Sequence, residues 1–152
     1  MKNSLDMNAL RSTLKVSVAT SEKMFGSDDP NFKRIHHHNH HIVLYIKDFV
    51  MKERCKNYFE IGTHFGHSLS NMLQSKYESK FISCDLFQKG SSIASDCLIS
   101  DIEELANKNA QRFNINDYYY KIFKGNSYSE EMLKMVKEEF PEGIDLLFID
   151  GD

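Results

Sequence analysis

The spacing of hydrophobic residues changes several times along the chain, and each change marks a different predicted element. Over residues 5–25, apolar side chains recur every three or four positions, which predicts a first helix. Turn-forming residues follow, and a second helical pattern begins near Ile35 or within the neighbouring histidines. We expect this second helix to be amphipathic, with one apolar and one charged face. The predicted buried face consists of Ile42, Tyr45, Ile46, Phe49 and Val50, and the polar face of Lys47, Asp48 and Lys52.

Four short segments have the composition of buried β-strands instead. They are rich in aromatic and β-branched residues, and a glycine or an acidic residue follows each of them closely. The segments between them return to helical spacing, and two begin with the capping-box pattern, at Ser100–Glu103 and Ser127–Glu130. Strands that alternate with helices favour right-handed crossovers, so we expect an α/β, Rossmann-like, mostly parallel sheet with flanking helices. The predicted strands are Asn57–Ile61, Lys80–Cys84, Tyr118–Phe123 and Ile144–Ile149.

The composition excludes several classes of function. The 152 residues include 19 basic and 22 acidic side chains, so the net charge is -3 and no strong positive field favours nucleic acid or an anionic membrane. No apolar run reaches the ~18 residues of a membrane helix, and the first residues lack an apolar signal-sequence core. The three cysteines form no CxxC pair, which favours reduced thiols and a cytoplasmic protein. We expect one domain over residues 35–152, preceded by a helical extension over residues 1–34.

Candidate chemistry lies at the ends of the predicted strands. In open parallel sheets, ligands bind beyond the carboxyl ends of the strands, where this chain has glycines and acids. Gly62 and Gly66 permit a tight turn before the next helix, and Asp85 lies 19 residues after Gly66, close to the spacing at which an acid reaches a ribose. The G-x-x-x-G spacing differs from the G-x-G-x-x-G of dinucleotide enzymes, because His64 stands where the second glycine would be. This difference favours a ligand that has a ribose but no pyrophosphate.

Two motifs support a family resemblance. The segment Tyr58–Ser70 (YFEIGTHFGHSLS) resembles the first motif of class I S-adenosylmethionine-dependent methyltransferases. Phe148–Asp152 (FIDGD) is similar to the FIDGDH signature of an O-methyltransferase-like branch of that superfamily, and the resemblance spans residues 35–152. It implies S-adenosylmethionine as cofactor, with Asp85 at the ribose hydroxyls, and a Mg²⁺ site at Asp150 and Asp152. The implied cofactor-binding residues are Glu60, Gly62, Thr63, Gly66, Asp85, Asn126, Ser127 and Asp150, the pair Asn126 and Ser127 lying near the adenine.

The resemblance implies methyl transfer to a hydroxyl group of a small molecule, with no catalytic residue identified. The family's sheet has seven strands, so we expect this chain to supply the N-terminal half of that fold and to lack the strands that shape the acceptor pocket. A hydrophobic fourth strand at the sheet edge invites pairing with a second copy of the chain, so we expect self-association. Two alternatives stay open: a nucleotide- or NAD-binding domain, and a truncated Rossmann-like interaction module without catalytic activity.

Several histidines and cysteines have no role in this hypothesis. The run His36–His41 could bind a transition metal, but a polar, partly exposed helix start is the favoured interpretation. His64 and His67 flank the glycine turn, where either could contact a ligand. Cys84 and Cys97 are predicted to be unreactive thiols.

Overall fold

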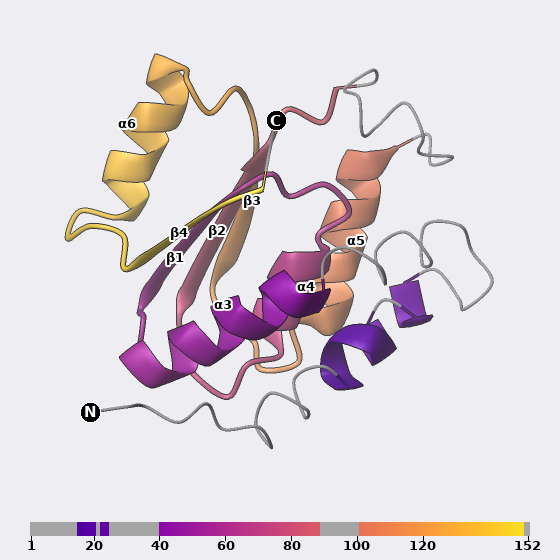
Figure 1. Cartoon of the computed structure of the whole chain (residues 1–152). Helices are drawn as coiled ribbons and strands as arrows, with labels where there is room; N and C mark the ends of the chain where they lie inside the picture. The colour runs from indigo at the N-terminus through magenta and orange to yellow at the C-terminus, as the bar shows by residue number, and fades with distance from the viewer. Residues whose placement is uncertain (1–14, 21, 25–39, 89–100, 151–152) are drawn as a thin grey trace. The chain divides into compact units, whose positions relative to one another are not determined.

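The computed structural model describes residues 15–20, 22–24, 40–88 and 101–150 (Figure 1). Their contacts divide the chain into two units, residues 1–54 and 55–152. In the first unit, residues 15–20 and 22–24 are helical, and helix α3 covers His40–Glu53. Helix α3 is described from His40 onward, within the region where the second helix was predicted to begin. The rest of the first predicted helix lies outside the described residues, as do His36, His37, His38 and Cys97.

The buried face of α3 differs from the predicted one. Val43, Ile46 and Val50 are buried, and Lys47 on the same stripe is only 5% exposed. The prediction was wrong for Ile42, Tyr45 and Phe49, which are 39%, 65% and 46% exposed. Two overlapping stripes of this helix have apolar spacing, and the buried one includes a lysine whose methylene stem is itself apolar. Burial lowers the pKa of the Lys47 ammonium group to about 8.

The second unit contains a four-stranded parallel sheet, as predicted, with the strand order β3-β2-β1-β4. Two of the predicted strands are confirmed within one residue at each end, and the other two begin two residues later than predicted. The elements of this unit are β1 (Asn57–Ile61), α4 (His67–Leu73), β2 (Lys80–Asp85), α5 (Ile102–Phe113), β3 (Tyr120–Lys124), α6 (Glu130–Glu139) and β4 (Leu146–Ile149).

Helices cover both faces of this sheet (Figure 1). On one face, Phe59 and Ile82 pack in a core with Met132, Met135 and Phe140 from α6 and the residue after it. Helix α4 lies against the opposite face of the sheet and packs on α5. Every residue of α4 is buried, which explains why this short helix carries no charged side chain.

The helix caps differ from the predicted capping boxes. The N-cap of α5 is Asp101, whose side chain accepts a hydrogen bond from the Glu104 amide at 2.9 Å. The N-cap of α6 is Ser129, whose hydroxyl accepts from the Met132 amide at 3.1 Å, so the predicted box at Ser127–Glu130 was wrong. Both true caps lie within two residues of the predicted ones, because several neighbouring side chains here can act as caps.

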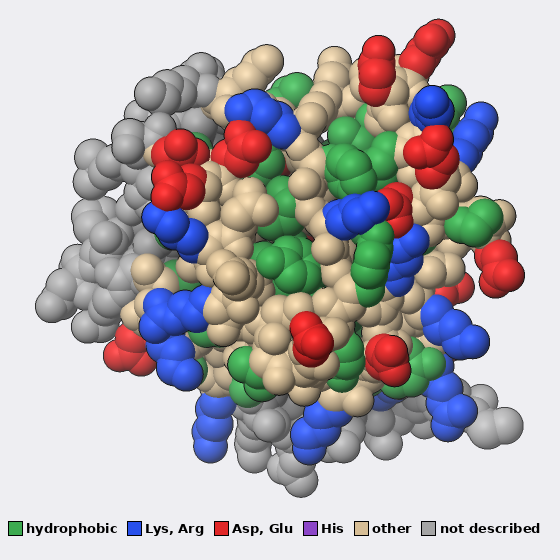
Figure 2. All heavy atoms as spheres, turned by 180° about the vertical axis from the view of Figure 1, so that it is seen from behind, with side chains coloured by type: hydrophobic (Ala, Val, Ile, Leu, Met, Phe, Trp, Pro, Cys, Tyr) green, Lys and Arg blue, Asp and Glu red, His purple; other side chains and the backbone are tan. Residues whose placement is uncertain are grey.

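An ionic cluster attaches the end of α6 to the sheet. The Glu139 carboxylate pairs with Lys80 at 2.6 Å and with Lys121, and it accepts a hydrogen bond from the Tyr119 hydroxyl at 3.1 Å. Partial burial would raise the pKa of Glu139, but the bonds from Lys121, Lys80 and Tyr119 outweigh it and lower the pKa to about 2. Figure 2 shows opposite charges set side by side among exposed hydrophobic side chains on one face of the structure.

Strand β4 is an outermost strand of the four-stranded sheet, paired on one side only, as predicted. Two of its apolar side chains, Leu147 and Ile149, are 47% and 62% exposed. They share a sheet face with Phe59 and Ile61, their register partners on β1, so they extend the apolar face that α6 covers further along the sheet. Within the described residues, no helix has the length and apolar character needed to span a membrane.

Candidate functional site

The four strands end together at one edge of the sheet, and hydrogen bonds join the segments that follow them. The Gly62 amide after β1 donates to the Cys84 carbonyl at 2.8 Å, and the Gly125 amide after β3 donates to the Asp85 carbonyl at 2.9 Å. The Asp150 amide after β4 donates to the Ile61 carbonyl, also at 2.8 Å. The structure therefore brings together the strand ends that the sequence singled out, at the edge where open α/β sheets bind ligands.

The loop between β1 and α4 makes a sharp turn that depends on its backbone conformation. Gly62, His64 and Gly66 have φ angles of 101°, 46° and 76°, which lie in the left-handed region. Gly66 is also the N-cap of α4, and a Cβ at this position would lie 3.2 Å from the Ala106 carbonyl oxygen of α5. Gly66 thus has a clear structural role, because the turn and the close approach of α5 both require glycine.

Asp85 holds two segments of backbone through its side chain. Its carboxylate accepts from the His64 amide at 2.8 Å and from the Phe87 amide at 2.7 Å. Both donors are non-glycine residues with left-handed backbones, at φ 46° and 48°, a conformation that costs energy and that occurs often at functional sites. A carboxylate has about four acceptor positions, so the two that remain can receive hydrogen bonds from a ligand.

Glu60 lies beneath this loop and is fully buried. Its two carboxylate oxygens accept hydrogen bonds from the hydroxyls of Ser68 and Ser83, the latter at 3.0 Å. The Ser83 hydroxyl is also 2.6 Å from the hydroxyl of Thr63, so one chain of hydrogen bonds runs from the loop to the carboxylate. Burial, with smaller contributions from the charges of Asp150 and Asp85, raises the pKa of Glu60 to about 8 despite the hydrogen bonds from both serines.

Sequence reasoning missed Ser68 and Ser83, although both touch a predicted site residue. Ser83 stood in a strand whose other central residues are apolar, and Ser68 stood within the first motif. A buried polar residue in a parallel strand needs a partner, which was the available signal. Its partner could not be named, because only the fold brings α4 and β2 against Glu60.

The segment after β3 lies close to Asp85 through the Gly125 amide. The Asn126 side chain accepts a hydrogen bond from the Tyr128 amide at 2.9 Å, so it shapes the turn that leads into α6. Asn126 is exposed and Ser127 is half-buried, so both can be reached from solvent. Their predicted contact with an adenine ring stays a prediction.

The second predicted motif falls partly outside the structure. Asp150 is described and exposed at the end of β4, whereas Asp152 lies outside the described residues. Among the described side chains, no group of three His, Cys, Asp or Glu is arranged to hold a metal ion. The Mg²⁺ site at Asp150 and Asp152 therefore stays a prediction.

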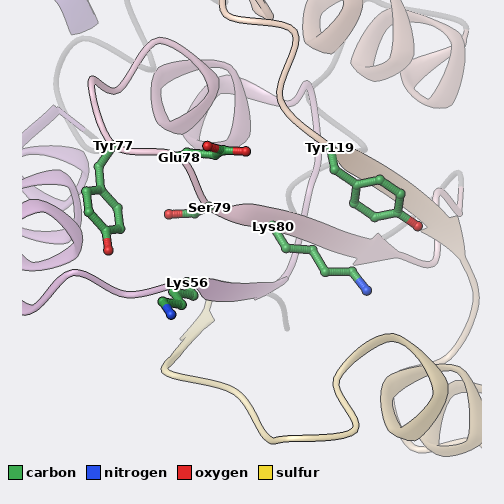
Figure 3. A pocket seen from close by; sticks show the side chains of 6 residues that line it. All are labelled: Lys56, Tyr77, Glu78, Ser79, Lys80 and Tyr119. Carbon is green, nitrogen blue, oxygen red and sulfur yellow. The ribbon is translucent and has the colours of Figure 1, made fainter.

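A hollow of about 720 Å³ lies at the opposite, amino-terminal edge of the sheet (Figure 3). Its polar groups are largely engaged in structural bonds. Lys80 pairs with Glu139, and the Ser79 hydroxyl donates to the Cys55 carbonyl at 2.6 Å. The hollow is lined by Lys56, Tyr77, Glu78, Ser79, Lys80 and Tyr119. Apart from its size, this hollow has no feature that indicates a ligand-binding site. We therefore place the candidate site at the carboxyl ends of the strands.

The topology and the glycine loop define a Rossmann-like α/β fold, and solved structures share it. The chain is similar to a methyltransferase from Podospora anserina with SAH bound, with a TM-score of 0.54 and 16% identity over 99% of this chain and 53% of that one. It is also similar to an O-methyltransferase from Bacillus cereus in complex with SAH, with a TM-score of 0.54 and 20% identity over 99% of this chain and 57% of that one. Likeness at these identities establishes the fold.

A sequence relative extends the comparison. An uncharacterized protein of Acanthamoeba polyphaga mimivirus is 34% identical over 131 residues, which cover 86% of this chain and 51% of the relative. No family model matches the sequence. The chain thus spans about half the length of the viral relative and of the two solved structures.

Proposed function

We propose that the chain binds S-adenosylmethionine at the carboxyl edge of its sheet and contributes the cofactor half of an enzyme that methylates a hydroxyl group of a small molecule. The observation that carries this proposal is the Asp85 carboxylate, held by two backbone amides beside the glycine loop with acceptor positions to spare. The similar structures from Podospora anserina and Bacillus cereus, which bind SAH, support it.

In this proposal each part of the site has a role set by its chemistry. The free acceptor positions of Asp85 receive the two ribose hydroxyls, and the loop from Gly62 to Gly66 borders the amino-acid part of the ligand. Carboxylates suit a ligand that carries a positive sulfonium and a positive amine, whereas they would repel a pyrophosphate. Methyl transfer is an in-line displacement, so the chain's contribution is to orient the donor rather than to form a covalent intermediate.

The test is calorimetric titration of the folded chain with S-adenosylhomocysteine, comparing the wild type with Asp85→Ala. The variant is expected to lose about 5- to 150-fold in affinity, because a lost buried hydrogen-bonding partner costs roughly 1–3 kcal/mol. Asp145→Ala is the matched control: Asp145 also accepts from two backbone amides, those of Lys56 and Asn57 at 2.7 and 3.0 Å, but at the opposite edge of the sheet. It should bind like the wild type.

The alternatives give different results in the same experiment. Binding of NAD in preference to S-adenosylhomocysteine would favour a dinucleotide-binding domain. The His64 side chain at the position of the second glycine argues against that outcome. No binding of either compound by a chain with native circular dichroism would overturn the proposal and favour a non-catalytic interaction module.

A further inference from the structure

We propose that Ser83 is a positioning residue of the candidate cofactor site, because its hydroxyl joins Glu60 and Thr63 in one buried chain of hydrogen bonds. The inference rests on the proposed function for its ligand, but the chain of hydrogen bonds can be tested without one. Ser83 is fully buried in the middle of the sheet and does not itself face the strand-end edge.

The donor and acceptor in each of these hydrogen bonds follow from the number of protons available. A serine hydroxyl has one proton, and Ser83 donates it to Glu60 at 3.0 Å when the carboxylate is ionised. The hydroxyl of Thr63, 2.6 Å from that of Ser83, must then be the donor to Ser83. Thr63 is thereby fixed in one orientation within the loop, although no hydrogen bond of the described structure joins it to Glu60 directly.

Ser83 and Asp85 act from the same face of β2. They are two residues apart in a strand, so their side chains point to the same side. Ser83 holds the loop through the side chain of Thr63, and Asp85 holds it through the amide of His64 at 2.8 Å. One strand therefore fixes two successive residues of the loop by two independent side chains, and only Asp85 is placed to reach a ligand.

The two serines are the groups that stabilise the ionised form of Glu60, because the charges near it are negative. The groups that act on it are Asp150, Asp85 and the two serine hydroxyls, and the phenol of Tyr58 lies on the same face of β1. Among the described ion pairs, none brings a lysine or arginine to Glu60. Hydrogen bonds from Ser68 and Ser83 are thus what favours its ionised form. A cationic ligand at the loop would favour the same form, so its binding should be coupled to loss of the Glu60 proton.

The first experiment uses the ligand-free chain and follows the carboxyl carbon of Glu60 by ¹³C NMR between pH 5 and 10. In Ser83→Ala the midpoint of the Glu60 titration is expected to move to higher pH, because one donor to the ionised form is lost. Ser83→Thr keeps the hydroxyl and should restore the wild-type midpoint. Ser79→Ala is the matched control, since Ser79 is a buried serine that donates to a carbonyl next to the other end of β2.

The second experiment measures S-adenosylmethionine affinity of the same variants across this pH range. Loss of the donor should weaken binding about tenfold near pH 7, with a smaller loss above the Glu60 midpoint, whereas a general packing defect would weaken it equally at every pH. If Ser83→Ala does not fold, Ser83→Cys keeps the volume with a weaker donor and carries the same prediction.

The two experiments separate the two proposals. An unchanged Glu60 midpoint in folded Ser83→Ala or Ser83→Cys overturns the role of Ser83. A pH-independent loss of affinity also overturns it. If Ser83→Ala shifts the Glu60 midpoint but the wild-type chain binds no S-adenosylmethionine, the proposed function is overturned. The control of Glu60 by Ser83 is then still supported.

Discussion

Replacing Glu60 by glutamine should make the stability of the chain less sensitive to alkaline pH. Glutamine has nearly the shape of glutamate and can still hydrogen-bond to Ser68 and Ser83, but it cannot ionise. In the folded chain the pKa of Glu60 is raised from 4.5 to about 8, mainly by burial. Between these two values the folded state holds a proton that the unfolded state has released, so the free energy of unfolding falls as the pH rises.

The size of this effect follows from the two pKa values. Stability is fully present below pH 4.5 and is lost progressively until the pH passes about 8. At about 1.4 kcal/mol per pH unit the ceiling is roughly 4–5 kcal/mol, and relaxation around the charge lowers what is observed. We therefore expect Glu60→Gln to gain roughly 2–4 kcal/mol relative to the wild type when the pH is raised from 5 to 8.5.

The assay is urea denaturation of both proteins at pH 5 and pH 8.5, followed by far-ultraviolet circular dichroism because the chain has no tryptophan. Only the difference between the two proteins is interpreted, since the other titrating groups are common to both. Glu78→Gln, which removes an exposed carboxylate, controls for the loss of one surface charge. If the difference between wild type and Glu60→Gln is the same at both pH values, the reasoning about burial is refuted.

Three further predictions follow from single features of the structure. Gly66→Ala should destabilise the chain by roughly 1–3 kcal/mol in the same denaturation assay, because the left-handed backbone and the Ala106 carbonyl at 3.2 Å both oppose a side chain; an unaffected variant would mean that the turn relaxes freely. Lys47→Met should raise the free energy of unfolding at pH 7 by roughly 1–3 kcal/mol, because the folded wild type then buries a charged ammonium group, whose pKa burial lowers from 10.5 to about 8. The gain should shrink towards pH 10, where the folded state holds Lys47 neutral, and a constant gain would contradict this cause. The exposed edge of β4 predicts self-association that rises with protein concentration in sedimentation velocity, and Leu147→Lys should reduce it; a wild type that stays monomeric at high concentration would count against the edge as an interface.

Much of the fold could be predicted because each strand can be recognised from its own local composition. Asn57–Ile61 is short, aromatic and β-branched, and it ends at a glycine whose backbone conformation few other residues adopt. The alternation of such segments with helical spacing is a property of the chain alone. Positions of Gly62 and Asp85 at the strand ends followed from the same reasoning.

The features that could not be predicted depend on contacts between distant residues. Two faces of α3 have the apolar spacing of a buried helix face, so local spacing could not show whether Ile42 or Val43 is buried. Likewise, the sequence pattern around an acidic residue at a strand end is the same whether its side chain is exposed or buried. The fold buries Glu60 and joins it to Ser68 of α4 and Ser83 of β2, so its pKa is raised and it is not a solvated carboxylate.

The strand order has a consequence for how the chain acquires its structure. The central strand β1 pairs on one side with β2, about 20 residues later, and on the other with β4, whose neighbour Asp145 bonds to Lys56 across 89 residues of sequence. During synthesis, β1, β2 and β3 are made before β4, which comes last in the sequence. Until β4 is made, one side of β1 has unpaired backbone groups beside apolar side chains, which is the kind of surface that leads to aggregation. Formation of the β1–β4 pair carries the largest loop-closure cost in this sheet, so we expect it to come last and to limit the folding rate.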